Sequence, residues 1–106
     1  EDGERSIPEL ENWQRRQALK RAMAARHERA CFLARCKAGE VAPAEAMAAP
    51  VAQGVPARRF IESFPGFGRA RAEAVMEDAG ISSTRRVRGL GCRQRETVLA
   101  ALEGRR

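Results

Sequence analysis

The sequence has few aromatic residues: four phenylalanines, one tryptophan and no tyrosine among 106 residues. Much of its apolar composition is alanine, which contributes little buried area per residue, and this predicts one compact domain with a modest core. The missing tyrosines, and the distance along the chain from Trp13 to the basic turns described below, argue against base stacking as the main mode of binding single-stranded nucleic acid.

Long apolar runs are also absent. No stretch approaches the ~20 apolar residues that span a bilayer, and no signal-peptide pattern is found, so we expect a cytoplasmic protein without membrane contact. The three cysteines, Cys31, Cys36 and Cys92, are an odd number without zinc-ligand spacing, and His27 is the only histidine. We therefore expect free thiols in a reducing compartment, with no metal site and no cofactor.

Positive charge is abundant: the formal net charge is +6, and Lys20 and Lys37 are the only lysines. Residues 55–106 carry 11 basic and 6 acidic residues, a net of +5, whereas residues 1–54 carry 9 basic and 8 acidic residues, a net of +1. A basic half on a small domain indicates a polyanionic partner, most simply nucleic acid. Solvated surface arginine without a partner is the alternative that charge alone leaves open.

Composition divides the chain into four segments. Residues 1–9 are polar and acidic, as expected of a flexible arm. Residues 10–38 contain no proline or glycine and predict one long helix, ended by Gly39. Residues 39–55 form an alanine- and proline-rich connector, and residues 56–103 form a compact basic domain. No stretch alternates as a strand does, so we predict an all-α fold of about five helices, with the long N-terminal helix packed on the domain.

Within these segments, short helices are predicted at 44–48 and 57–63, and longer ones at 69–79 and 92–103. The long N-terminal helix is predicted to be amphipathic, with an apolar stripe that includes Leu19, Met23, Ala30, Leu33 and Ala34. Its basic face either adds a weaker contact to a polyanion or is an ordinary solvated surface.

The two basic glycine turns carry the functional signal. The first is Phe64-Pro65-Gly66-Phe67-Gly68-Arg69 and the second is Arg85-Arg86-Val87-Arg88-Gly89-Leu90-Gly91, and a predicted helix follows each. A helix start exposes unpaired N–H groups and the positive end of the helix dipole, and glycines let a phosphate approach them. Gly68 is predicted to adopt a backbone conformation that a side chain would hinder.

One such turn is equally well explained as a corner between two helices. Two turns, with seven arginines against three acids between residues 69 and 95, predict binding to a phosphate backbone rather than to bases. The predicted DNA-contacting residues are Pro65, Gly66, Phe67, Gly68, Arg69, Arg71, Arg85, Arg86, Arg88, Gly89, Gly91, Arg93 and Gln94.

The same residues carry a family resemblance. The run from Phe64 to Arg69, then Arg71-Ala72, Met76-Glu77 and Gly80-Ile81-Ser82, and the second turn with Gln94, resemble the actinobacterial integration host factor family over about residues 56–102. The arginine-rich second turn is the most distinctive part. Phe64 and Phe67 replace aliphatic residues usual in that family, Arg69 replaces a lysine, and Cys92-Arg93 replace a small polar pair. The connector is shorter and richer in alanine and proline than expected, which leaves its function open, including a second DNA contact near it.

The resemblance implies a helix-two-turns-helix domain, of a kind that a small-subunit ribosomal protein and certain DNA glycosylases also carry. It further implies a nucleoid-associated protein that binds double-stranded DNA with little sequence preference, affects DNA architecture and assists phage integrase in recombination. The contacts that it implies are Pro65, Gly66, Gly68 and Arg69 in the first turn, and Arg85, Arg86, Arg88 and Gly89 in the second.

Other functions are less consistent with the residues. Lyase chemistry needs an accessible amine, but Lys20 and Lys37 both lie in the first helix. The acids Glu73, Glu77 and Asp78 fit the outer face of a helix better than a metal site of a nuclease. We therefore expect no enzyme and no catalytic residue. An RNA- or ribosome-associated module with the same domain is the alternative, a protein–protein adaptor remains open, and nothing in the sequence suggests more than a monomer.

Overall fold

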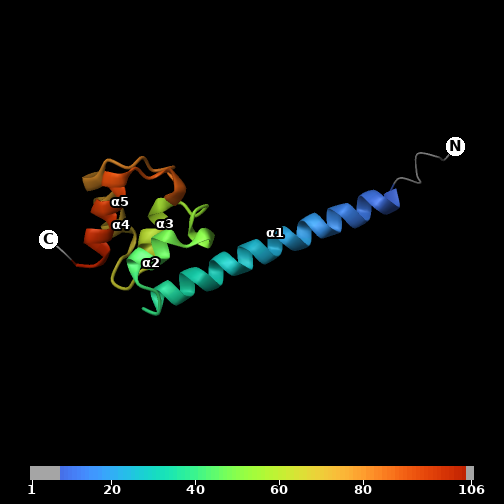
Figure 1. The fold of residues 1–106 in the computed structure, drawn as a ribbon, viewed down its shortest axis with the longest axis horizontal. Helices are drawn as coiled ribbons and strands as arrows, with labels where there is room; N and C mark the ends of the chain where they lie inside the picture. The colour runs from blue at the N-terminus through green and yellow to red at the C-terminus, as the bar shows by residue number, and fades with distance from the viewer. Residues whose placement is uncertain (1–7, 105–106) are drawn as a thin grey trace.

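The computed structural model describes residues 8–104, and these residues form an all-α structure that confirms the predicted fold class (Figure 1). Residues 1–7 of the predicted arm lie outside the described residues. The α-helices are α1 (Pro8–Lys37), α2 (Pro43–Ala48), α3 (Ala57–Glu62), α4 (Arg69–Ala79) and α5 (Cys92–Leu102), with single 3-10 turns at η2 (Pro50–Ala52) and η3 (Val87–Gly89).

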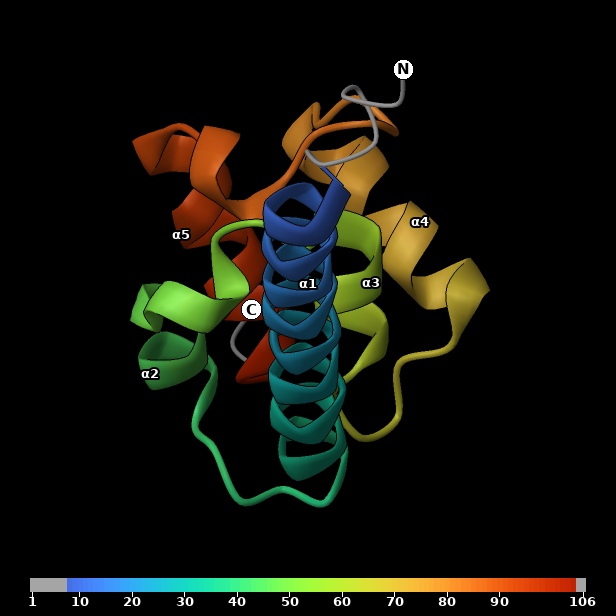
Figure 2. The ribbon, with the colours of Figure 1, turned by 90° about the vertical axis from the view of Figure 1, so that its right-hand side faces the viewer.

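Helix α1 extends far beyond the rest of the molecule (Figure 1), and the whole molecule has dimensions of 70 × 27 × 22 Å. Figure 2 looks along α1, with the helices of the domain around it. Only its C-terminal turns pack against the domain, where Phe32 and Cys36 are buried. Leu19 and Met23 are 57% and 55% exposed, so the prediction that they face a core was wrong. A helix of 30 residues is about 45 Å long, longer than the surface available for it to pack on.

The prediction that α1 is amphipathic was also wrong. Its apolar and charged residues are spread almost evenly around the helix axis. The apparent stripe consists largely of alanines, which define no strongly apolar face. The side that does pack is set by Phe32, Leu33 and Cys36 at its C-terminal end, against the region of η2.

Glycine and proline end and begin the helices as the sequence predicts. Gly39 (φ +79°) and Gly80 (φ +69°) adopt the left-handed conformation just after α1 and at the end of α4. The N–H groups of Gly80 and Ile81 donate to the carbonyls of Glu77 and Met76, which closes the last turn of α4. Pro43 occupies the first turn of α2.

The core takes residues from all five α-helices, and the most extensive contacts are those of α4 with α3 and with α5. Phe60 and Phe64 pack edge to face with ring centroids 5.2 Å apart. Val87 and Val98, from the second turn and from α5, are fully buried beside them in the same cluster. Because the core takes residues from both turns, its packing fixes where the turns lie.

The connector is not a passive spacer. The side-chain amide nitrogen of Gln53 donates to the carbonyls of Met47 and Ala49, at 2.9 Å each. The backbone then pairs with the second turn, because Ala57 N–H donates to Arg85 (2.8 Å) and Val87 N–H donates to Val55 (3.0 Å). The sequence did not predict this pairing, which ties residues 53–57 to the arginine-rich turn.

The thiols give a direct check of this packing. Cys36 is fully buried, and burial raises the pKa of its thiol, with Ser63 and Arg35 acting in the opposite direction. The thiolate is the reactive species, so two thiols, Cys31 and Cys92, should react rapidly with Ellman's reagent in the folded protein. Cys36 should react only on unfolding. A Cys36→Ala variant should keep two rapid thiols, and three rapid thiols in the folded wild type would contradict the structure.

Candidate nucleic-acid interface

The first turn depends on Gly66 rather than on Gly68. Gly66 has a φ of +85°, a conformation that L side chains rarely adopt. Gly68 has an extended backbone, with φ −91° and ψ −170°, and a Cβ atom there would meet no atom within 4 Å. The predicted special conformation at Gly68 was therefore wrong. The free space beside Gly68 leaves the start of α4 open to an external group.

Some backbone N–H groups at this turn donate to an acceptor within the protein, and others do not. The Phe67 N–H, predicted to face a phosphate, donates instead to the Phe64 carbonyl at 3.1 Å, and the Phe67 ring is buried. Within residues 8–104, no backbone acceptor is recorded for the N–H groups of Gly66, Gly68 and Arg69. These three donors lie at the positive end of the α4 dipole, which favours an anion.

Arg71 stabilises the turn from inside. Its guanidinium donates to the Gly66 carbonyl at 3.0 Å and lies 4.3 Å from the centroid of the Phe67 ring. It therefore holds both the left-handed glycine and the buried aromatic ring. The side chain remains exposed, so part of its positive charge still faces solvent.

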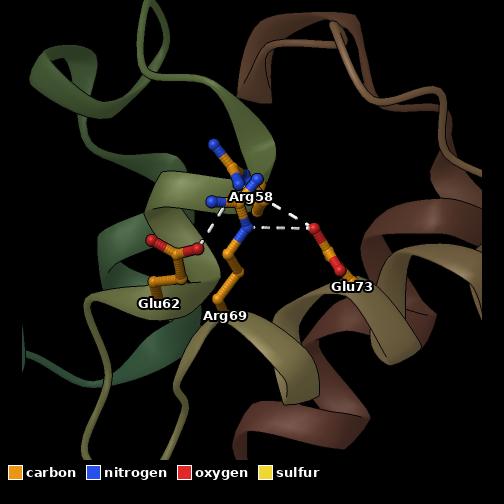
Figure 3. Close-up of polar contacts among 4 residues, drawn as sticks. All are labelled: Arg58, Glu62, Arg69 and Glu73. Atoms are coloured by element: carbon orange, nitrogen blue, oxygen red, sulfur yellow. Dashed lines mark hydrogen bonds and ion pairs between the residues drawn. The ribbon is translucent and has the colours of Figure 1, made fainter.

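Arg69 points instead into a small ion-pair network with Arg58, Glu62 and Glu73 (Figure 3). The Nε of Arg69 lies 3.2 Å from Glu73, and Arg58 approaches both Glu73 (3.9 Å) and Glu62 (3.8 Å). The Arg69–Glu73 pair is exposed on both sides, so it is worth little energy in water. Sequence reasoning did not single out Arg58 or the pairing with Glu73.

In the second turn, two predicted phosphate ligands also have structural roles. Arg85 donates to the Gly89 carbonyl at 2.8 Å, and Arg86 donates to the Gly54 carbonyl. The N–H of Gly89 was predicted to be available to a phosphate, but it donates to the Arg86 carbonyl. These bonds close the turn and join it to the connector while both guanidinium groups stay exposed.

The start of α5 is closed by Gln94. Its amide oxygen accepts the Gly91 N–H at 2.9 Å, and its amide nitrogen donates to the Gly80 carbonyl at 3.1 Å. Gln94 therefore links the end of α4 to the start of α5. Gln94 and the Gly91 N–H were predicted to contact a phosphate, but both make hydrogen bonds within the protein. Arg95 adds bonds to the carbonyls of Val87 and Leu90.

Two arginines near the second turn have no recorded side-chain partner within residues 8–104. Among the described residues, the side chains of Arg88 and Arg93 make no recorded hydrogen bond or ion pair. Arg88 lines a shallow cup of about 380 Å³ whose lining residues are Ser82, Thr84, Arg85, Arg86, Arg88 and Gly89. Hydroxyl groups and guanidinium groups around one cup form a set of donors that suits a phosphate.

A second hollow lies along α4. It has a volume of about 570 Å³ and is lined by Arg58, Arg69, Glu73, Met76, Glu77, Ile81 and Ser83, so carboxylates as well as guanidinium groups face it. Helix α4 has eleven residues and is about 16 Å long, and it lies between the first turn and the segment that leads to the second. In the part of the chain that the structure describes, no cluster of metal-ligating side chains occurs and no helix has the length and hydropathy to cross a membrane.

This geometry defines a class: residues 39–102 match the family model described as "S13-like H2TH domain", a helix-two-turns-helix fold. The chain is 39% identical over 102 residues to an integration host factor of Streptomyces coelicolor, which covers 92% of both chains. It is 35% identical over 98 residues to those of Mycolicibacterium smegmatis and Mycobacterium tuberculosis, each match covering 89% of this chain and 93% of the relative. The chain therefore belongs to the actinobacterial integration host factor family, as the motifs predicted.

A solved structure is also similar. The chain titled "Structure of sIHF bound to an 8bp palindromic DNA" is 34% identical to this one, with a TM-score of 0.69. The match covers 78% of this chain and 98% of that chain.

The two glycines of the first turn should differ in their effect on stability. Gly66→Ala should lower the free energy of unfolding by about 1–2 kcal/mol, because it places a side chain at positive φ. Gly68→Ala should change it by less than about 0.5 kcal/mol, because its backbone is extended and its surroundings are open. Urea unfolding followed by circular dichroism compares the two, and equal losses would contradict the assignment.

Proposed function

We propose that this chain is a non-enzymatic, nucleoid-associated protein that binds the phosphate backbone of double-stranded DNA with little sequence preference. The observation that carries the proposal is the set of exposed arginines and unpaired amides at the two turns. Arg69, Arg71 and the N–H groups of Gly66, Gly68 and Arg69 lie at the first turn, and Arg85, Arg86 and Arg88 line the cup at the second. The similar solved structure, described as bound to an 8bp palindromic DNA, also supports binding to DNA.

Two kinds of contact make up the proposed interface. At the first turn, the N–H groups of Gly66, Gly68 and Arg69 receive one phosphate, with Pro65 and the Arg69 guanidinium beside it. At the second turn, Arg88 contacts a second phosphate in the cup, and Arg85 and Arg86 contribute their exposed charge while they hold the turn. Arg93 extends the positive surface onto α5.

This arrangement predicts readout of the backbone rather than of bases. The donors are backbone amides and guanidinium groups. At the start of α5, Gln94 and Arg95 bond to the backbone of the domain, which leaves Arg93 as the one side chain of this run without a recorded bond among the described residues. An effect on DNA architecture, assistance to site-specific recombination and a location on the nucleoid follow from the family and form part of the proposal.

An RNA-binding function is the alternative, because the matched family model is described as S13-like. Fluorescence anisotropy with a labelled random duplex, competed by unlabelled duplex or by structured RNA of equal length, separates the two. Stronger competition by duplex is expected. Stronger competition by RNA would overturn the proposal.

Removal of the two unpartnered arginines should weaken binding without unfolding the protein. For Arg88→Ala/Arg93→Ala we expect about tenfold weaker binding to every duplex sequence. The slope of log affinity against log salt concentration should be about −4 to −5 for the wild type and less steep by roughly 2 for the variant. The control is Arg16→Ala/Arg21→Ala, which removes the same charge from the far part of α1. A flat salt response of the wild type, or an equal effect of the control, would contradict phosphate binding at the two turns.

Glu73 should act as an internal competitor of DNA. Its carboxylate occupies Arg69 and contacts Arg58, and a phosphate must displace it to bind Arg69. We expect Glu73→Gln to tighten duplex binding about three- to tenfold, on the order of 1 kcal/mol. Glu77→Gln removes the same charge from the same hollow without breaking a recorded ion pair, so it should have a smaller effect. Equal effects would mean that only net charge matters.

A further inference from the structure

Three neighbouring hydroxyl residues before the second turn face two different hollows. Ser82 and Thr84 line the cup of about 380 Å³, together with Arg85, Arg86, Arg88 and Gly89. Ser83, which lies between them in the sequence, lines instead the hollow along α4 that also contains Glu73 and Glu77. Adjacent serines therefore have opposite electrostatic surroundings: Ser82 lies among arginines, and Ser83 shares its hollow with carboxylates.

The segment that carries these hydroxyl groups is accessible. Residues 82–85 form a tight turn in which the Arg85 N–H donates to the Ser82 carbonyl at 3.0 Å, and all four residues are exposed. An exposed loop of small polar residues is the part of a fold that another enzyme reaches most readily. Among the described residues, no carboxylate lines the cup that Ser82 faces.

The groups around the Ser82 hydroxyl are suited to a phosphate. The Thr84 N–H donates to Ser82 Oγ at 3.4 Å, and Thr84 Oγ1 lies 3.3 Å from the same atom. Arg85 and Arg86 are exposed although each donates to a carbonyl, and the Arg88 side chain makes no recorded bond among the described residues. A phosphate attached to Ser82 Oγ would therefore have an amide, a hydroxyl and guanidinium groups as donors within its own cup.

We propose that Ser82 is a phosphorylation site and that its phosphate occupies the arginine cup in place of a DNA phosphate. In the transfer, Ser82 Oγ attacks the γ-phosphorus of ATP in the active site of a serine/threonine protein kinase. The bond from that phosphorus to the β–γ bridging oxygen breaks as the new bond to Oγ forms, and ADP leaves. The hydroxyl proton passes to the catalytic base of the kinase and then to solvent.

The proposal rests on the proposed function, because the cup is one of the two phosphate sites assigned to DNA. An attached phosphate brings a charge of about −1.5 to −2 at neutral pH, and its tether keeps it next to the arginines at a high effective concentration. It removes an attractive contact and adds repulsion toward the duplex at the same place. The same charge on Ser83 would leave the cup open.

The first experiment asks whether Ser82 accepts the phosphate. Wild-type protein, Ser82→Ala and Ser83→Ala are incubated with ATP and a soluble extract of the cells that produce the protein. Tryptic peptide 72–85 contains Ser82, Ser83 and Thr84, and fragmentation in a mass spectrometer assigns the modified residue. We expect phosphate on Ser82 in the wild type and in Ser83→Ala, and none in Ser82→Ala. An unmodified peptide, or phosphate on Ser83 or Thr84 alone, would overturn the proposal.

The second experiment measures the consequence for DNA binding. Ser82→phosphoserine and, as the matched control, Ser83→phosphoserine are produced by genetic incorporation, so both proteins gain the same charge one residue apart. Their affinity for a labelled random duplex of about 24 base pairs is measured by anisotropy across a salt series. We expect binding to weaken about thirtyfold for the phosphate at 82 and about threefold or less for the phosphate at 83. Equal losses would mean that net charge alone acts, and the proposal would fail.

A measurement without DNA separates this proposal from the proposed function. The phosphorus NMR signal of each phosphoserine protein is followed as the pH is varied. Guanidinium groups favour the dianion, so the phosphate at 82 should lose its second proton at a lower pH than the phosphate at 83. If the two titrate alike, the cup does not hold the phosphate and this proposal is overturned even if the protein binds DNA. If they differ as expected and the unmodified protein does not bind duplex, the proposed function fails while the phosphate site at Ser82 stands.

Discussion

The backbone pairing between the connector and the second turn is the interaction on which the rest of the surface depends. Ala57 and Val87 donate across it to Arg85 and Val55, next to the isolated bridge between Pro56 and Arg86. Residues 85–88 include three arginines, and without this pairing the repulsion between their positive charges would spread the loop. The pairing holds the charges at fixed positions, and a ligand then does not have to order them first.

The arginines of this domain divide into two groups with different work. Arg71, Arg85 and Arg95 donate to backbone carbonyls of the turns, and Arg86 donates to a carbonyl of the connector; Arg95 reaches two carbonyls at once. Arg88 and Arg93 form the second group, which makes no recorded side-chain bond among the described residues. A lysine, with one compact charge, would serve less well in the first group, because it cannot both donate to a carbonyl and stack on an aromatic ring as Arg71 does on Phe67.

The sequence predicted the helices where local signals are strong. The bounds of α4 follow from the apolar spacing of Ala72 and Met76 and from Gly80, and they were correct. The sequence could not predict which donors turn inward, because Gln94 looks the same whether it caps a helix or contacts a phosphate. It also missed Gln53, whose bonds to two carbonyls leave no pattern in an alanine-rich connector. The exposed part of α1 was misjudged because helix propensity reports local preference and not the length of the surface available for packing.

The exposed N-terminal part of α1 and the packed domain differ in the source of their stability. Between about residues 11 and 23 almost all side chains of the helix are exposed, so its helicity rests largely on intrinsic propensity and on side-chain pairs such as Glu11 with Arg15. Like charges one turn apart, such as Arg16 and Lys20, oppose it. This segment therefore opens and closes independently of global unfolding. A polyanion that neutralised its charges would stiffen it, and the helix would be longest and straightest in the bound state.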